Sequence, residues 1–123
     1  MRKQRGHTRT ALHGFGSVTT LDATHGAAWA QLARLYMRLG HVRRADDALE
    51  RAVAHQDGNP VVQDLIANTF SLLGEQDRAA EWLERAVAAR PEHVPFLVDL
   101  ANNQMFRGQL EEAQRTVRRA LTQ

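Results

Sequence analysis

The fold is decided by the stretch Pro60–His93, which reads PVVQDLIANTFSLLGEQDRAAEWLERAVAARPEH. When this stretch is shifted by its own length in either direction, it matches the sequence on both sides. The matching positions share one residue type in each set: Gly40, Gly74 and Gly108; Ala33, Ala67 and Ala101; Ala45, Ala79 and Ala113. Self-similarity at a fixed period is the sequence signature of a repeat protein. We therefore interpret the chain as an array of three copies of one unit.

Each unit carries the pattern of two amphipathic helices. Apolar residues recur at i, i+3, i+4, i+7 and i+10 in the first helix of the first unit: Trp29, Leu32, Ala33, Tyr36 and Leu39. The glycine that follows is free to take positive φ and should end the helix. Pro60 suits the first turn of a helix, because its missing N–H would have no partner there. The sequence predicts helix pairs over repeats 26–59, 60–93 and 94–123.

The repeated alanines indicate where helices pack closely. A side chain of one methyl group lets two helix backbones approach, and larger neighbours then fill the space beside the contact. We expect this filling role for Leu32, Leu49, Leu83, Leu100 and Val117.

Composition limits the classes of function. The 123 residues are 43% hydrophobic and 24% charged, so most of the chain is not disordered by composition, and there is no cysteine for disulfides or thiolate-bound metals. The net charge of +2 is made of +3 in residues 1–25 and −1 in the remainder, so the array is not a basic nucleic-acid surface. No apolar run reaches the roughly 18 residues of a membrane span. We expect a cytoplasmic protein, and the arginine and alanine bias suggests a bacterial source.

Residues 1–25 form a basic segment interrupted by Gly6, Gly14 and Gly16. It lacks the apolar core of a secretory signal. We expect a flexible leader. Two alternatives stay open: a basic arm that binds nucleic acid, and packing of Leu12, Phe15 and Val18 onto the first repeat.

The unit resembles the tetratricopeptide repeat (TPR) family, whose helix–turn–helix unit carries the pattern Trp-x2-Leu-Gly-x2-Tyr, then Ala-x3-Phe, then Pro. The chain has Trp29-x2-Leu32-Ala33-x2-Tyr36 followed by Ala45-x3-Leu49, and it repeats Ala79-x3-Leu83 and Ala113-x3-Val117. The resemblance implies an all-α, right-handed superhelical solenoid of three repeats. Its concave groove would be lined by the first helices, and its function would be to bind a peptide or partner protein there.

The resemblance also implies which residues line that groove. Asn68 and Asn102 occupy the ninth position of successive repeats, where an amide can pair with a peptide backbone of any sequence; two solvated helix asparagines are the alternative. The chaperone-tail clamp of some family members is absent, since Asp99 would repel a terminal carboxylate. Arg34 and Arg38 could attract an acidic peptide. The predicted binding residues are Arg34, Met37, Arg38, Asp64, Asn68, Ser71, Asn102, Met105 and Phe106.

We expect no catalytic residues, metal site or cofactor. No two of the six histidines are spaced as a metal pair on a predicted helix. No phosphate-binding glycine loop or nucleophile elbow occurs. The protein is thus predicted not to be an enzyme.

The last predicted helix, Leu110–Leu121, leaves Val117 and Leu121 without a following element. Solenoids usually cover such an end. The chain could be a fragment of a longer protein, could self-associate through this helix, or could tolerate the exposure because Arg115, Arg118 and Arg119 solvate it. The repeat style is similar to the N-terminal repeats of bacterial TPR–sulfotransferase proteins. The alternative function is therefore an accessory domain of a larger enzyme.

Overall fold

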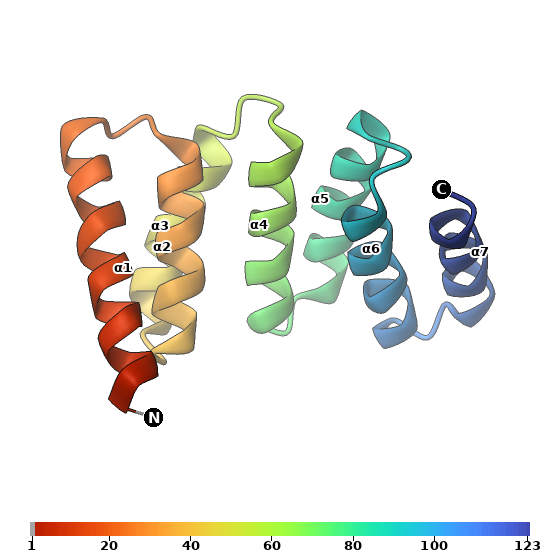
Figure 1. Cartoon of the computed structure of the whole chain (residues 1–123), viewed down its shortest axis with the longest axis horizontal. Coiled ribbons are helices and arrows are strands. Elements are labelled where there is room, and N and C mark those ends of the chain that lie inside the picture. Colours follow the sequence, from red (N-terminus) through yellow and green to blue (C-terminus); the bar gives the residue numbers. More distant parts are fainter. Residues whose placement is uncertain (1) are drawn as a thin grey trace. The chain divides into compact units, whose positions relative to one another are not determined.

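The computed structural model describes residues 2–123, with side chains from residue 6 onward, and these residues form seven α-helices (Figure 1). The helices are α1 (Arg2–Leu21), α2 (Gly26–Arg38), α3 (Val42–Ala54), α4 (Pro60–Leu72), α5 (Gln76–Ala89), α6 (Val94–Phe106) and α7 (Leu110–Leu121). They group into two compact units, Met1–Asp57 and Gly58–Gln123. The all-α fold class predicted from the helix pairs is confirmed. Within the described residues, no helix combines the length and the apolar character needed to cross a membrane.

The three glycines that recur once per repeat end the first helix of each pair in the same way. Gly40, Gly74 and Gly108 have φ values of 78°, 80° and 78°. In each turn the glycine N–H donates to the carbonyl three residues earlier at 3.0 Å, and the next N–H donates five residues back at 2.8–2.9 Å. This double pattern is a Schellman motif, which pairs carbonyls that the helix end would leave free. The repeated glycine is therefore required by its positive φ.

The first unit contains α1, α2 and α3, with α2 packed against both of the others. Gly26 begins α2 against the end of α3, and a Cβ at this position would overlap the carbonyl oxygen of His55. The Nδ1 atom of His25 caps α2 by accepting the N–H of Ala28 at 3.1 Å. The backbone contact at Gly26 thus fixes how closely the two helices approach.

Helix α1 differs from the expected flexible leader. Most of residues 1–25 form this helix, which packs on α2, buries Thr19 and half-buries Leu12, Phe15 and Val18. The expectation was wrong because the repeat pattern of this segment, and not its glycines, decides its conformation. Gly6, Ala11 and Phe15 lie one repeat length before Gly40, Ala45 and Leu49, so α1 carries the pattern of a second helix. Packing of an apolar face overrides the weak helix propensity of glycine. The nucleic-acid alternative depended on the basic residues from Arg2 to Arg9. The side chains of residues 2, 3 and 5 lie outside the described side chains, and Arg9 is exposed on α1.

The second unit contains α4 to α7. Helices α4 and α5 form one pair, α6 and α7 form the next, and α5 packs on α6. The first helices α4 and α6 also touch each other. Ile66, Leu83 and Leu97 are among its fully buried large side chains, and the recurring alanines Ala67, Ala79 and Ala113 are buried beside them. This arrangement places one face of α4 next to one face of α6.

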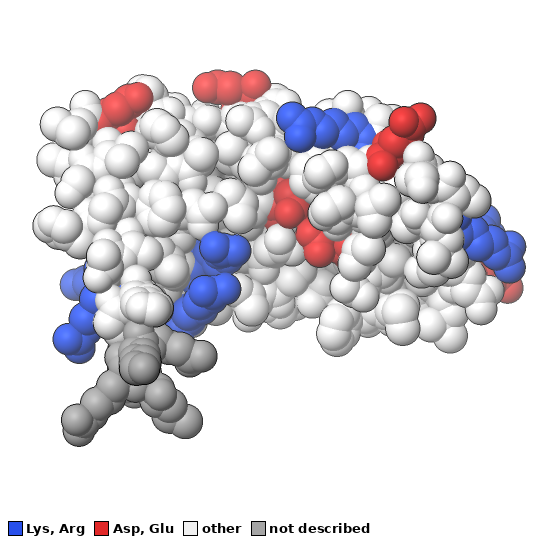
Figure 2. Space-filling model, in the orientation of Figure 1, with Lys and Arg blue, Asp and Glu red and all other residues white. Residues whose placement is uncertain are grey.

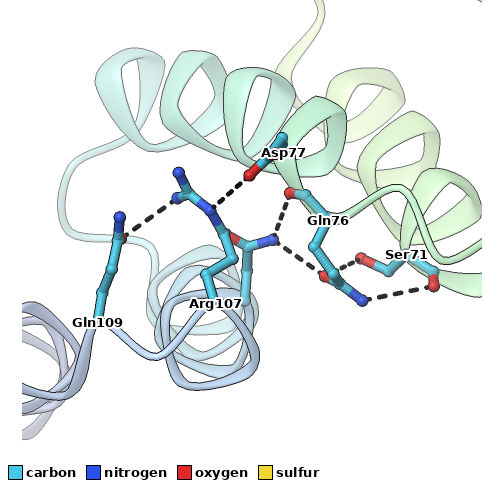
Figure 3. A network of polar contacts seen from close by, with 6 residues as sticks. Ser71, Gln76, Asp77, Arg107 and Gln109 are labelled. Atoms are coloured by element: carbon cyan, nitrogen blue, oxygen red, sulfur yellow. Dashed lines mark hydrogen bonds and ion pairs between the residues drawn. The ribbon is translucent and has the colours of Figure 1, made fainter.

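A polar network fixes the turn of one repeat to the next (Figure 3). The Nδ2 atom of Asn103 donates to the backbone carbonyl of Gln76 at 2.9 Å and to its Oε1 atom at 3.1 Å. The Ser71 hydroxyl donates to the same Oε1 atom at 3.3 Å. Beside them, the Nε atom of Arg107 lies 3.2 Å from Asp77 Oδ1. The α4–α5 turn is therefore tied to the end of α6.

Val117 does not fill the gap that the repeat pattern assigned to it. Its side chain is 43% exposed, whereas the equivalent Leu83 is 1% exposed. Helix α5 packs against both α4 and α6, but α7 packs only against α6 among the described helices. Besides Ala113, α7 buries Thr116, whose hydroxyl donates to Gln104 Oε1 at 2.7 Å.

Candidate functional site

The nine predicted binding residues lie on three first helices, α2, α4 and α6. Those on α2 belong to the first unit and are Arg34, Met37 and Arg38. Arg34 is half-buried and its Nη2 atom donates to Gln31 Oε1 at 3.0 Å, while its buried Nε atom has no partner among the described residues. Burial, with a smaller contribution from the charge of Arg38, lowers the pKa of Arg34. Only Arg38 is fully available on this helix.

On α4, Asp64, Asn68 and Ser71 are all half-buried. The Nδ2 atom of Asn68 donates to Asp64 Oδ2 at 3.3 Å. Ser71 belongs to the polar network with Gln76, so its hydroxyl already serves the fold. The structure thus brings Asp64 and Asn68 together as one polar pair and assigns Ser71 a structural contact.

On α6, Asn102, Met105 and Phe106 are all exposed. Met105 is 56% exposed and Phe106 is 79% exposed, which is unusual for large apolar side chains on a helix that packs against its neighbours. Asn102 differs in this respect from its neighbour Asn103, which is buried and bonded to Gln76. Asn102, Met105 and Phe106 take no part in the polar network that ties the α4–α5 turn to α6.

Asp99 of α6 is within hydrogen-bonding reach of Asp64 of α4. Burial of Asp64, the hydrogen bond to the Asp99 carboxyl and the charge of Asp99 raise the pKa of Asp64 to about 8, and the Asn68 amide opposes this rise. A carboxyl this basic keeps its proton at neutral pH and can share it with its neighbour. Asp64 Oδ1 is buried without a hydrogen-bond partner among the described residues.

Together these side chains form what we call the α4/α6 face. Its members on α4 are Val61, Asp64, Asn68 and Leu72, and its members on α6 are Val98, Asp99, Asn102, Met105 and Phe106. Figure 2 shows acidic side chains set between uncharged neighbours in the region of α4 and α6. The face combines exposed apolar surface, two amides and a carboxyl pair.

Asp99 is the residue that sequence reasoning did not place in the site. It follows Asp64 by one repeat plus one position, so a search at the exact repeat offset does not pair the two. The observation that first helices of successive repeats touch along one face is what joins them. Among the described residues, no group of three or more histidine, aspartate or glutamate side chains is arranged to hold a metal ion.

Comparison with known proteins identifies the repeat. A family profile described as "Tetratricopeptide repeat" matches residues 4–69 and 73–123. The first of these ranges begins inside α1, in agreement with the repeat pattern of that helix. No protein of the curated set matches the chain in sequence.

Several solved structures share the fold. The chain is similar to a structure of Pseudomonas aeruginosa pilF, with 20% identity and a TM-score of 0.82 over 97% of this chain and 55% of that one. It is similar to MamA, with 22% identity and a TM-score of 0.77 over 98% of this chain and 70% of that one. It is also similar to YrrB, described as a TPR protein with an unusual peptide-binding site, with 18% identity and a TM-score of 0.73 over 98% and 62%.

Proposed function

Because the chain belongs to the tetratricopeptide repeat family, we propose that it is a protein-interaction module whose α4/α6 face binds an extended peptide of a partner protein. The observation that carries this proposal is that two amides, the half-buried Asn68 and the exposed Asn102, accompany exposed apolar side chains on two touching first helices. The amides supply contacts to a peptide backbone, and the apolar side chains supply area for its side chains.

The exposed apolar side chains of the face are unfavourable in contact with water unless a ligand covers them. Phe106, Met105 and Leu72 are each more than half exposed, whereas Ile66 and Leu97 of the same unit are fully buried. An exposed group of this kind on a soluble domain marks a surface for a ligand or partner. A bound peptide would remove part of this surface from water, which favours association.

Asn68 and Asn102 are suited to a ligand that presents peptide groups at regular intervals, as an extended peptide does. Asn68 and Asn102 lie one repeat length apart and occupy equivalent positions on α4 and α6. Each side-chain amide can donate to a peptide carbonyl and accept from a peptide N–H. The likeness to YrrB, whose description includes a peptide-binding site, supports the use of this fold for peptides.

The experiment is a selection of short random peptides displayed on phage, with the full chain as bait. The matched bait is the Asn68→Ala/Asn102→Ala double variant, and circular dichroism checks that it keeps the helix content of the parent. We expect peptides that bind the parent and lose about tenfold or more in affinity on the variant, because two hydrogen bonds of about 1 kcal/mol each are removed. Peptides that bind both baits equally would move the site away from this face.

Other hypotheses have narrower support. The exposed Arg38 of α2 could attract an acidic segment, but Arg34 is half-buried and donates to Gln31, so it is less accessible to a ligand than expected. Self-association through α7 is supported by the exposure of Leu110 and Leu121. Comparing the sedimentation of the parent with that of Leu121→Ser would test it.

Two further hypotheses rest on the sequence alone. They are an accessory role beside a catalytic domain, as in a TPR-containing sulfotransferase, and a cytoplasmic location.

A further inference from the structure

We propose that the peptide bound by the α4/α6 face carries a basic side chain, lysine or arginine, which docks on the paired carboxyls of Asp64 and Asp99. This inference rests on the proposed function and names the chemistry of its ligand. It starts from the position of the pair, which lies within the face that also exposes Asn102 and Phe106.

No basic side chain of the second unit neutralises the pair. Asp99 is the one charged group that acts on Asp64 among the described residues. On α5, which packs against both helices, Arg78 pairs with Glu75 and Arg85 lies over the Trp82 ring. After α6, Arg107 pairs with Asp77. On α7, Arg119 donates to the carbonyl of Pro91. Within the second unit, the carboxyl pair therefore has no ion-pair partner.

A proton holds the pair together in the free protein. Two carboxylates this close repel each other, and the partial burial of Asp64 makes its charged form less favourable still. The proton is a small substitute for a cation, because a single shared proton makes only one hydrogen bond between the two carboxyls. An ammonium or guanidinium group offers several donors to the two carboxyls and allows both to ionise.

The surroundings of the pair suit a basic residue flanked by apolar ones. Val98, Met105 and Phe106 are exposed on α6, and Val61 and Leu72 are exposed on α4. The aliphatic part of a lysine or arginine side chain can lie along such surface while its charged end reaches the carboxyls. Charge complementarity and apolar area thus point to the same kind of segment.

The first test compares the peptides that the random library yields on two baits. The second bait is Asp64→Asn/Asp99→Asn, which keeps the size and hydrogen-bonding capacity of both side chains and removes their charge. We expect the parent to enrich peptides with lysine or arginine at one recurring position. Replacement of that residue by glutamine in a selected peptide should weaken binding to the parent at least tenfold and leave binding to the double variant unchanged.

The outcomes separate this inference from the proposed function. Enriched peptides without a recurring basic residue, but dependent on Asn68 and Asn102, would overturn the inference and leave peptide binding in place. Peptides whose basic residue is equally important on both baits would also overturn it. A library that yields nothing on the parent would contradict the proposed function, and the inference would fail with it.

The second test needs no variant and measures how many protons are released when the peptide binds. Calorimetry of a selected peptide at about pH 7, in two buffers of different ionisation enthalpy, measures protons released on binding. Because the pKa of Asp64 is raised to about 8, the free pair holds most of a proton at this pH. We expect a release approaching one proton per peptide bound. A value near zero with a tightly bound basic peptide would contradict docking on the pair.

Discussion

Asp64 shows how one residue can link the fold to its ligand. It sits on the first helix of its repeat, close enough to Asp99 on the next first helix for the two carboxyls to share a proton. The hydrogen bond between the two carboxyls, which requires the proton, joins a residue of α4 to a residue of α6. The same pair becomes a source of repulsion when the proton leaves, unless a cation replaces it.

The stability of the protein should therefore depend on pH through Asp64. The pKa of this residue is raised from 3.8 to about 8, so the folded chain holds a proton that the unfolded chain releases. The contribution is fully present below about pH 4 and is lost as the pH rises through about 8. Urea unfolding of the parent should show a fall of about 1–2 kcal/mol over this range, a size reduced because the side chain is only partly enclosed. Asp64→Asn should remove this fall, and equal slopes in the two proteins would contradict the assignment.

Gly26 gives a second test at the scale of one residue. A Cβ at this position would overlap the carbonyl oxygen of His55, which is backbone and cannot rotate away. We expect Gly26→Ala to lower the free energy of unfolding by about 1–3 kcal/mol, since α2 and α3 must move apart. Thermal and urea unfolding would measure the change. A stability equal to that of the parent would mean that the two helices are not in this close contact.

At the scale of the element, equivalent positions in different helices have different surroundings. Leu83 of α5 and Val117 of α7 lie one repeat length apart, yet the first is buried and the second is exposed. Leu83→Ala should cost about 2–5 kcal/mol in the free energy of unfolding, because it opens a cavity between packed helices. Val117→Ala should cost less than about 1 kcal/mol. Urea unfolding of both variants checks the pair, and similar costs would show that α7 is covered in solution.

Helix α1 can be tested separately from the rest. Nothing lies within 4 Å of a Cβ added at Gly14, in contrast to Gly26, and Gly14 is inside the helix. Gly14→Ala should raise the free energy of unfolding by about 0.5–1 kcal/mol, because alanine favours a helix more than glycine does. Hydrogen exchange should show the amides of α1 slowed in the parent and slowed further in the variant. Rapid exchange in both proteins, with no gain in stability, would restore the flexible leader.

The order and the ends of most helices could be predicted from the sequence, because small and turn-forming residues recur once in each repeat. Gly40, Gly74 and Gly108 marked the helix ends through the positive φ that each adopts. The repeated alanines marked the close contacts, as their burial confirms. Helix α1 was missed although Gly6, Ala11 and Phe15 carry the same offset, since glycines within it suggested a break.

At the scale of the whole molecule, the site was harder to predict than the fold. Family membership explains why the first helices are the place to look for a ligand, but it does not distinguish Asn102, which is exposed, from Ser71, which bonds Gln76. It also did not pair Asp64 with Asp99, because their contact crosses from one repeat to the next with a shift of one position. Such differences arise from neighbours in space, which a repeat pattern alone does not give.

The measurement that tests the central claim most directly is nuclear magnetic resonance mapping of a library-selected peptide on the isotope-labelled chain. Our account predicts that the largest shifts on titration fall on the side-chain amides of Asn68 and Asn102 and on the backbone of Asp64, Asp99 and Phe106. Amides on the exposed surface of α5, around Glu81 and Glu84, should remain unchanged. Shifts that gather on α5 or α7, with α4 and α6 undisturbed, would contradict binding at the α4/α6 face.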